Sequence, residues 1–121
     1  MKINNMGPRL PERYQIRTRD INFNYVEWKG GDPQMLMLHG DMRTGRSFDA
    51  VSRELNGKYN IFAMDARGHG DSDWPETGYS IEDRIEDLAA FCKAAEIDNA
   101  IGIGHSLGGG IISLCNDRYE G

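Results

Sequence analysis

A single serine, Ser106, lies inside the densest glycine cluster of the chain, in the stretch GIGHSLGGG at residues 102–110. A short apolar run precedes this stretch, and an apolar segment with helical character follows it. A chain that passes from a strand into a helix within so few residues must turn sharply and hold the serine in a strained, exposed conformation. Side chains two residues before or after the serine would collide in such a turn, which explains Gly104 and Gly108.

Such a turn would suit a catalytic serine. A serine hydroxyl in water is a poor nucleophile. It needs exposure, a base that takes its proton, and donors for the oxyanion that forms on the substrate. The start of a helix provides such a donor in the Leu107 N–H, and the helix dipole there favours negative charge. Two other interpretations remain open. In the first, Ser106 has no chemical role and merely lies in a tight turn. In the second, Gly102, Gly104 and Gly108 form a loose dinucleotide-binding pattern. In the second case Leu107 takes the place of the usual third glycine.

Buried apolar runs alternate with amphipathic helical segments along the chain. We expect two half-buried strands within residues 13–29, buried strands at 34–40, 60–65 and 99–105, helices at 44–59, 80–97 and 106–119, and a polar loop at 66–79. The first two strands are placed to pair antiparallel, and the later alternation is typical of parallel strands. The predicted fold class is therefore α/β, a mostly parallel sheet with helices on both faces.

The spacing of the apolar residues predicts which face of each expected helix is buried. Phe48, Val51 and Leu55 recur at helical spacing in the first helix, which Gly57 ends. In the second helix the apolar face is predicted to comprise Ile81, Ile85, Leu88, Cys92 and Ala95. Ser80 and Asp83 predict a capping box at its start.

Length and composition narrow the class of protein. The 121 residues predict one domain, with residues 1–11 as a loose N-terminal arm. Fourteen basic against nineteen acidic residues give a net charge of −5, which argues against nucleic acid or an anionic membrane as partner. Two cysteines, Cys92 and Cys115, predict reduced thiols rather than a disulfide or a metal site. No signal-peptide or membrane-length run is visible, so we expect a cytoplasmic protein.

Three blocks together resemble the α/β-hydrolase fold family in its esterase, lipase and C–C-bond hydrolase branch. They are LMLHGDMRTG at residues 36–45, MDARGHGDSD at 64–73 and GIGHSLGG at 102–109. The likeness covers roughly residues 20–120. It implies a serine hydrolase without a cofactor, which acts on a small-molecule ester, thioester, lactone or activated C–C bond. Dehalogenase activity is not expected, because family members with that activity carry aspartate in place of the serine.

Carried over residue by residue, the resemblance makes Ser106 the nucleophile and the N–H groups of Leu107 and Asp41 the oxyanion hole. Asp41 departs from the family pattern, in which this position is apolar or small. A carboxylate there opposes the oxyanion unless it turns away, or unless the substrate carries positive charge. The residues expected to shape the site without reacting are His39, Gly40, Gly104, His105, Gly108, Asp65 and Arg67.

The resemblance also implies a triad in the order serine, acid, histidine. Only fifteen residues follow Ser106, and they include Asp117 but no histidine. Asp117 lies about three helical turns from the serine. Of the histidines, His39 and His69 are expected to fix loops, and strand alternation points His105 away. The sequence therefore predicts the N-terminal portion of a hydrolase that lacks the acid and the base, and is weakly active or inactive by itself.

The strand expected at residues 99–105 would be central in the family sheet and is an edge in this portion of it. An apolar, uncharged edge invites pairing. The sequence therefore predicts a homo-oligomer, or a complementing C-terminal half as partner. The alternative function is a non-catalytic α/β half-domain that serves in self-association or binding.

Overall fold

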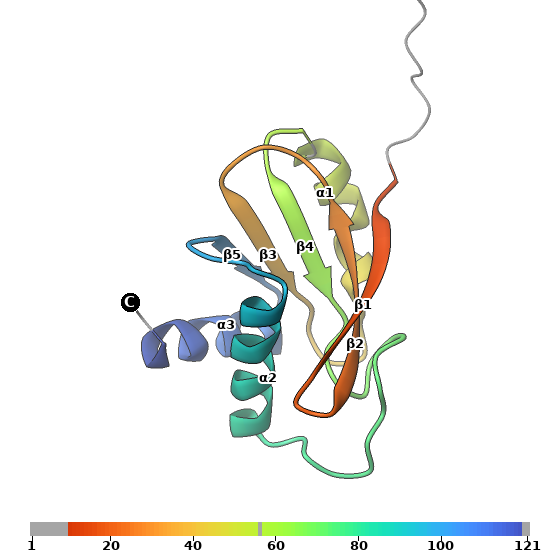
Figure 1. Ribbon diagram of the computed structural model, residues 1–121, viewed down its shortest axis with the longest axis vertical. Helices are drawn as coiled ribbons and strands as arrows, with labels where there is room; N and C mark the ends of the chain where they lie inside the picture. Colours follow the sequence, from red (N-terminus) through yellow and green to blue (C-terminus); the bar gives the residue numbers. More distant parts are fainter. Residues whose placement is uncertain (1–9, 56, 120–121) are drawn as a thin grey trace, which may run out of the picture.

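The structure is a computed structural model that describes residues 10–55 and 57–119. Figure 1 shows a twisted sheet with helices packed around it. The elements in chain order are β1 (Glu12–Thr18), β2 (Ile21–Trp28), β3 (Gln34–Leu38), the 3₁₀ turn η1 (Gly45–Phe48), α1 (Asp49–Leu55), β4 (Asn60–Met64), α2 (Ile81–Ala94), β5 (Ile101–Gly104) and α3 (Leu107–Arg118). Most of the expected arm at residues 1–11 lies outside the described residues. Residues 66–79 form the expected loop.

The five strands form one sheet in the order β1-β2-β4-β3-β5. β1 and β2 pair antiparallel, as expected, and β2 pairs antiparallel with β4. β3 lies between β4 and β5 and runs parallel to both. Only β2 therefore runs against the other four strands. In the register, Leu38 lies opposite Met64 on one side and Gly104 on the other, so β3, β4 and β5 end together.

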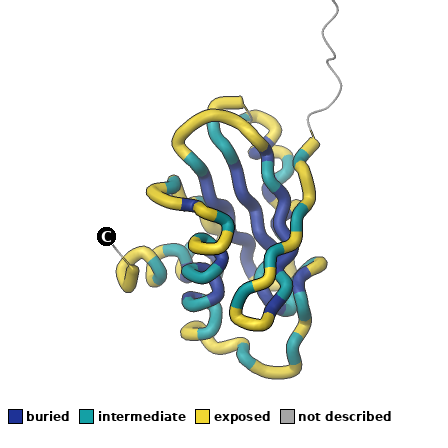
Figure 2. The backbone as a smooth tube through the Cα atoms, in the orientation of Figure 1, coloured by how far each residue is buried: buried dark blue, intermediate teal, exposed yellow. Residues whose placement is uncertain are grey.

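Alternate residues of the central strands feed two separate hydrophobic cores, one on each face of the sheet. Leu36 and Leu38 belong to the core under α2 and α3. Met35 and Met37 belong to the other core, which Phe48 of η1 covers. In Figure 2 the central strands are the most continuously buried part of the backbone. This two-sided burial confirms the predicted α/β fold, a mostly parallel sheet with helices on both faces.

The expected helix at residues 44–59 is shorter and begins differently. The chain first makes the 3₁₀ turn η1, capped by the side chain of Thr44, and only then the α-helix Asp49–Leu55. Gly45 is held against β4, because its N–H donates to Asp65 Oδ1 at 2.8 Å and an added Cβ would lie 2.6 Å from the Ala63 carbonyl oxygen. We attribute the tight first turn to this docking. Val51, expected on the buried face, is exposed.

Helix α2 has the predicted capping box, in which Ser80 and Asp83 cap each other's backbone N–H groups. Ile85 and Leu88 are buried as expected, but Ile81 is 45% exposed. The most deeply buried side chain of the helix is that of Phe91, and Asp87 is also buried. The buried face of α2 is therefore rotated away from Ile81 and toward Asp87 and Phe91. The spacing of the apolar residues alone did not indicate this rotation.

β5 spans four residues instead of the expected seven, and it is exposed rather than buried. Within the described residues it pairs on one side only, with β3, and Ile101 is 42% exposed. It is thus an edge strand of the described sheet. Both cysteines are free and half-buried, and burial raises the pKa of the Cys92 thiol to about 12. No helix among the described residues is long and apolar enough to cross a membrane.

Candidate active site

Three loops meet at the end of the sheet where β3, β4 and β5 finish. His39, Gly40 and Asp41 follow β3, and Ser106 follows β5 after a single intervening residue. The loop that starts at Asp65 follows β4. Connections leave β3 and β4 toward opposite faces of the sheet, since α1 covers one core and α2 the other. Binding sites in α/β sheets form at such a point, beyond the carboxyl ends of the strands.

Ser106 occupies the predicted position between a strand and a helix, as the N-cap residue of α3. Its backbone has φ +56° and ψ −121°, a conformation that residues with side chains rarely adopt. The residue is exposed, and its side chain does not cap the helix. Among the described residues, its hydroxyl has no hydrogen-bond partner. The turn therefore presents a strained, solvent-facing hydroxyl.

Two glycines make this turn possible. A Cβ at Gly104 would overlap the backbone of Gly109, and a Cβ at Gly108 would overlap the Leu38 carbonyl oxygen. Gly40 closes the other side of the turn, because a Cβ there would lie 3.2 Å from the Ser106 Cβ. The β3 loop thus packs directly on the serine turn.

His39 is buried, and its side chain connects the loop after β3 to the loop after β4. Its Nδ1–H donates to the Gly40 carbonyl at 2.6 Å, and its Nε2 accepts from the Ala66 N–H at 3.0 Å. Both ring nitrogens are occupied, which assigns a neutral imidazole. Burial is the main cause that lowers the pKa of His39 below its ordinary value. The ring therefore holds the β3 and β4 loops together and is not free to accept a proton from Ser106.

The Asp65 carboxylate organises the β4 loop from a buried position. Oδ1 accepts from the Gly45 N–H at 2.8 Å, while Oδ2 accepts from the Asp71 N–H and the Asn24 side chain, both at 3.0 Å. Its own carbonyl accepts from the Ser72 hydroxyl at 2.6 Å. Three donors satisfy a buried charge in this way. Asp65 therefore ties η1, β2 and the β4 loop to one point.

Arg67 is buried and points to α2. Its Nε and Nη2 donate to the two oxygens of Asp87 at 2.6 and 2.8 Å, and Nη1 donates to the Gly78 carbonyl. The hydrogen bonds to Asp87 raise the pKa of the guanidinium. Arg19, from the β1–β2 turn, donates to the same carboxylate at 2.6 Å. Asp87 thus joins α2 to both the hairpin and the loop.

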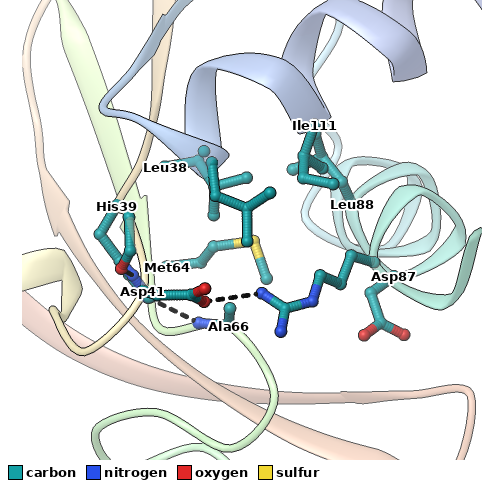
Figure 3. Close-up of a pocket in the computed structure, with 12 residues that line it drawn as sticks. Leu38, His39, Asp41, Met64, Ala66, Asp87, Leu88 and Ile111 are labelled. Atoms are coloured by element: carbon teal, nitrogen blue, oxygen red, sulfur yellow. Dashed lines mark hydrogen bonds and ion pairs between the residues drawn. The ribbon is translucent and has the colours of Figure 1, made fainter. Parts of the chain in front are cut away.

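The Asp41 side chain turns toward α2 and pairs with a cation there. Arg84 of α2 donates from Nη1 to Asp41 Oδ1 at 3.0 Å, and His69 Nε2 lies 3.7 Å from the same oxygen. Figure 3 shows this carboxylate directed across the pocket, with a dashed line to the guanidinium. Its electrostatic conflict with an oxyanion is thereby reduced. A positively charged substrate is not needed to explain Asp41.

A small pocket lies between the serine turn and α2, with a volume of about 20 Å³. Asp41 and Arg84 form its polar side, and Met64, Leu88 and Ile111 give it an apolar lining. The pocket also borders Leu107 and Gly108, the first residues of α3. The space is therefore adjacent to the backbone that follows Ser106.

The remaining candidates lie where they cannot serve Ser106 directly. His69 Nδ1 pairs with the Arg67 carbonyl at 3.0 Å, and its ring packs on His39. His105 is exposed and lies over Gly40. Asp117 is exposed near the far end of α3. Within residues 10–55 and 57–119, no histidine is hydrogen-bonded to the serine.

Sequence reasoning missed Arg84 and Asp87. With Phe91 they form a stripe at positions i, i+3 and i+7 along α2, beside the apolar face. This stripe was the available signal, although alternating charges on a helix usually mark a solvated face. In the part of the chain that the structure describes, no cluster of three or more His, Cys, Asp or Glu residues could hold a metal ion.

Comparison with known proteins gives consistent matches. A family model described as alpha/beta hydrolase fold matches residues 33–119. A 2-(acetamidomethylene)succinate hydrolase of Mesorhizobium japonicum is 40% identical over 83 residues, or 69% of this chain and 30% of that protein. A non-heme chloroperoxidase of Streptomyces lividans is 42% identical over 108 residues, or 87% of this chain and 39% of that protein. This chain therefore spans about a third of the length of these relatives.

A solved structure gives the same result in three dimensions. The crystal structure of E-2-(acetamidomethylene)succinate hydrolase superposes with a TM-score of 0.85 at 33% sequence identity. The match covers 91% of this chain and 41% of that structure.

Two of the glycines in this region permit a matched test of the turn. We expect Gly108→Ala to lower the free energy of unfolding by about 3 kcal/mol, because the new methyl group would overlap the Leu38 carbonyl. Gly110→Ala is the control, since an added Cβ there meets nothing within 4 Å. It should stabilise α3 by up to about 1 kcal/mol. Urea unfolding followed by circular dichroism measures both. Equal stability of the two variants would contradict the close approach of α3 to β3.

Burial of His39 makes stability depend on pH. In the unfolded chain the ring takes up a proton near its ordinary pKa of 6.5, while the folded ring stays neutral to lower pH. The free energy of unfolding should therefore be greatest above about pH 6.5 and fall as the pH drops below it. His39→Gln should flatten this dependence between pH 7.5 and 5.5 in urea titrations. The exposed His105→Gln is the control, and equal flattening by both variants would argue against burial as the cause.

Proposed function

Because this chain belongs to the α/β hydrolase fold family, we propose that it carries the nucleophile portion of a serine hydrolase, with Ser106 as the nucleophile. The main support is the backbone of Ser106, held at φ +56° with an exposed hydroxyl at the start of α3. Strain of this kind at a polar residue is typical of functional sites. The reaction proposed is attack of Oγ on the carbonyl carbon of an ester, thioester, lactone or activated C–C substrate.

The oxyanion formed in this attack is proposed to accept hydrogen bonds from the N–H groups of Leu107 and Asp41. Neither N–H donates a hydrogen bond to another residue of the described chain. Leu107 is the first residue of α3, where the helix dipole favours negative charge. The pairing of the Asp41 carboxylate with Arg84 reduces its repulsion of an oxyanion, which supports the use of the Asp41 backbone as a donor.

The base and the acid of the triad are proposed to lie outside these 121 residues. The ring nitrogens of His39 are both engaged, and Asp65 is engaged by three donors. The relatives are about three times as long as their match to this chain, which leaves room for both groups. By itself the chain should be only weakly active, because Ser106 would attack the substrate without a general base to take its proton.

A small acyl compound is the proposed substrate. One relative, 40% identical, is named as a hydrolase of 2-(acetamidomethylene)succinate, a small organic acid. No cofactor is required by the proposed reaction.

Replacement of the serine tests the proposal. We expect slow release of p-nitrophenol from p-nitrophenyl acetate by the wild-type chain, and at least a tenfold loss in Ser106→Ala. A fluorophosphonate should label Ser106, as located by mass spectrometry of tryptic peptides. Ser113→Ala, an exposed serine on the same helix, is the matched control and should behave as wild type. Unchanged turnover and labelling in Ser106→Ala would mean that the serine is a bystander.

A second candidate function is assembly through β5 as a non-catalytic half-domain. The exposed edge Ile101–Gly104 carries no charged residue, and edges of this kind pair with other strands. Leu114 on α3 is a further exposed apolar side chain. The partner proposed is a second copy of this chain or a complementing segment.

Sedimentation velocity at tens of micromolar protein tests this assembly. We expect the wild-type chain to sediment as a dimer or larger species, and Ile101→Lys to shift it toward monomer because the charge would be buried in the new pairing. Leu10→Lys, at an exposed position next to β1, is the control and should not change the distribution. A monomeric wild-type chain would exclude self-association.

A further inference from the structure

We propose that Arg84 binds a carboxylate of the substrate, so that the enzyme acts on esters or related acyl compounds whose acyl portion carries a negative charge. This inference rests on the proposed serine hydrolase function and adds the substrate class. It assigns Arg84 a role in specificity and none in the bond-breaking step.

Arg84 has unused hydrogen-bonding capacity at the site. Its Nε is buried and has no hydrogen-bond partner among the described residues, and its side chain is only 17% exposed. Its hydrogen bond to a side chain is the single bond from Nη1 to Asp41. A guanidinium carries five donors in a fork that matches a carboxylate with two parallel hydrogen bonds. A partly desolvated arginine with one such bond is therefore suited to accept a better-matched anion.

The Asp41 carboxylate marks where such an anion would lie. Oδ1 is 3.0 Å from Arg84 Nη1 and 3.7 Å from His69 Nε2, so two nitrogen groups already converge on one oxygen. The Asp41 side chain is 59% exposed and can move into solvent. A substrate carboxylate can thus take its place without unfolding any part of the site.

The other charges near the pocket do not cancel the field of Arg84. Asp87 also lines the pocket, but Arg67 occupies both of its oxygens and Arg19 donates to one of them. Its negative charge is therefore balanced by two other guanidinium groups. Asp41 is left as the direct competitor for Arg84.

The pocket relates this cation to the proposed reacting centre. Arg84, Asp41 and Leu107 border the same small space, and the last two supply the proposed oxyanion donors. A volume of about 20 Å³ has room for a group close to the size of a water molecule. Because this space alone does not hold an acyl chain, the substrate carboxylate would take the place of the Asp41 carboxylate at Arg84, with the substrate carbonyl at the Leu107 and Asp41 N–H groups.

Binding can be measured without any turnover, by titration of ¹⁵N-labelled protein with succinate and with uncharged succinamide as the matched ligand. We expect succinate to shift amide resonances of residues 39–41 and 84, and succinamide to bind at least tenfold more weakly. Arg84→Gln should weaken succinate binding at least tenfold. Asp41→Asn removes the competing carboxylate but keeps the backbone N–H, so it should tighten succinate binding.

Arg43→Gln is the charge control, because Arg43 is exposed on the other side of His39 and borders a different pocket. It should leave the succinate affinity within about twofold of wild type. Equal weakening by Arg84→Gln and Arg43→Gln would show binding by overall charge and overturn the proposal. Absence of succinate binding to a folded wild-type chain would also overturn it.

Turnover separates this inference from the proposed function. Mono-p-nitrophenyl glutarate and p-nitrophenyl acetate are compared in wild type, Arg84→Gln and Ser106→Ala. We expect Arg84→Gln to lower kcat/KM for the glutarate ester alone, at least tenfold. If Ser106→Ala abolishes turnover while Arg84→Gln leaves the ratio of the two esters unchanged, the carboxylate site is wrong and the serine hydrolase stands. If Ser106→Ala retains turnover, the proposed function fails, whatever the succinate titration shows.

Discussion

The close approach of α3 to the backbone of β3 is the constraint on which the rest of the site depends. Gly108 lies against the carbonyl groups of Leu38 and His39, and Gly104 lies against the first turn of the helix. Because neither position carries a side chain, α3 can begin at Leu107, directly after Ser106, and Ser106 takes its strained conformation. Leu107 and Asp41 consequently come to the same end of the sheet.

Buried polar groups then fix the loops around this turn. His39 joins the β3 loop to the β4 loop, and Asp65 joins the β4 loop to η1 and β2. Each of these groups uses its hydrogen-bonding atoms within the protein, so water is not needed to satisfy them. The proposed oxyanion hole would then need little reorganisation as charge develops, which is the main requirement for electrostatic stabilisation of an oxyanion.

Much of this arrangement follows from the sequence, because local signals and the fold agree. The apolar runs predicted the strands of the parallel part of the sheet, and the glycines around Ser106 predicted the strand–helix turn. The capping box at Ser80 predicted the start of α2. These features depend on residues close together in the sequence, and the folded structure agrees with these local preferences.

The features that sequence did not predict depend on contacts between distant segments. Asp87 is buried where Arg19 and Arg67 reach it from elsewhere in the chain, and the stripe of positions 84, 87 and 91 does not identify these distant partners. The orientation of Asp41 depends likewise on Arg84, which is 43 residues away. The tight η1 turn in place of a longer helix reflects the contact of Gly45 with β4. In each case contacts between distant segments determine the local structure, and the spacing of residues along the chain does not predict it.

The shared carboxylate of Asp87 has a consequence for how the molecule folds. Arg19 lies 68 residues from Asp87, and Arg67 lies 20 residues from it, yet Arg67 donates to both carboxylate oxygens and Arg19 donates to one of them. Loss of both guanidinium groups would leave a buried charge uncompensated, at a cost of several kcal/mol, whereas either one alone still pairs with the carboxylate. The hairpin and the β4 loop are therefore each coupled to α2 through one buried carboxylate, so that disorder of either segment removes part of the stabilisation of the helix.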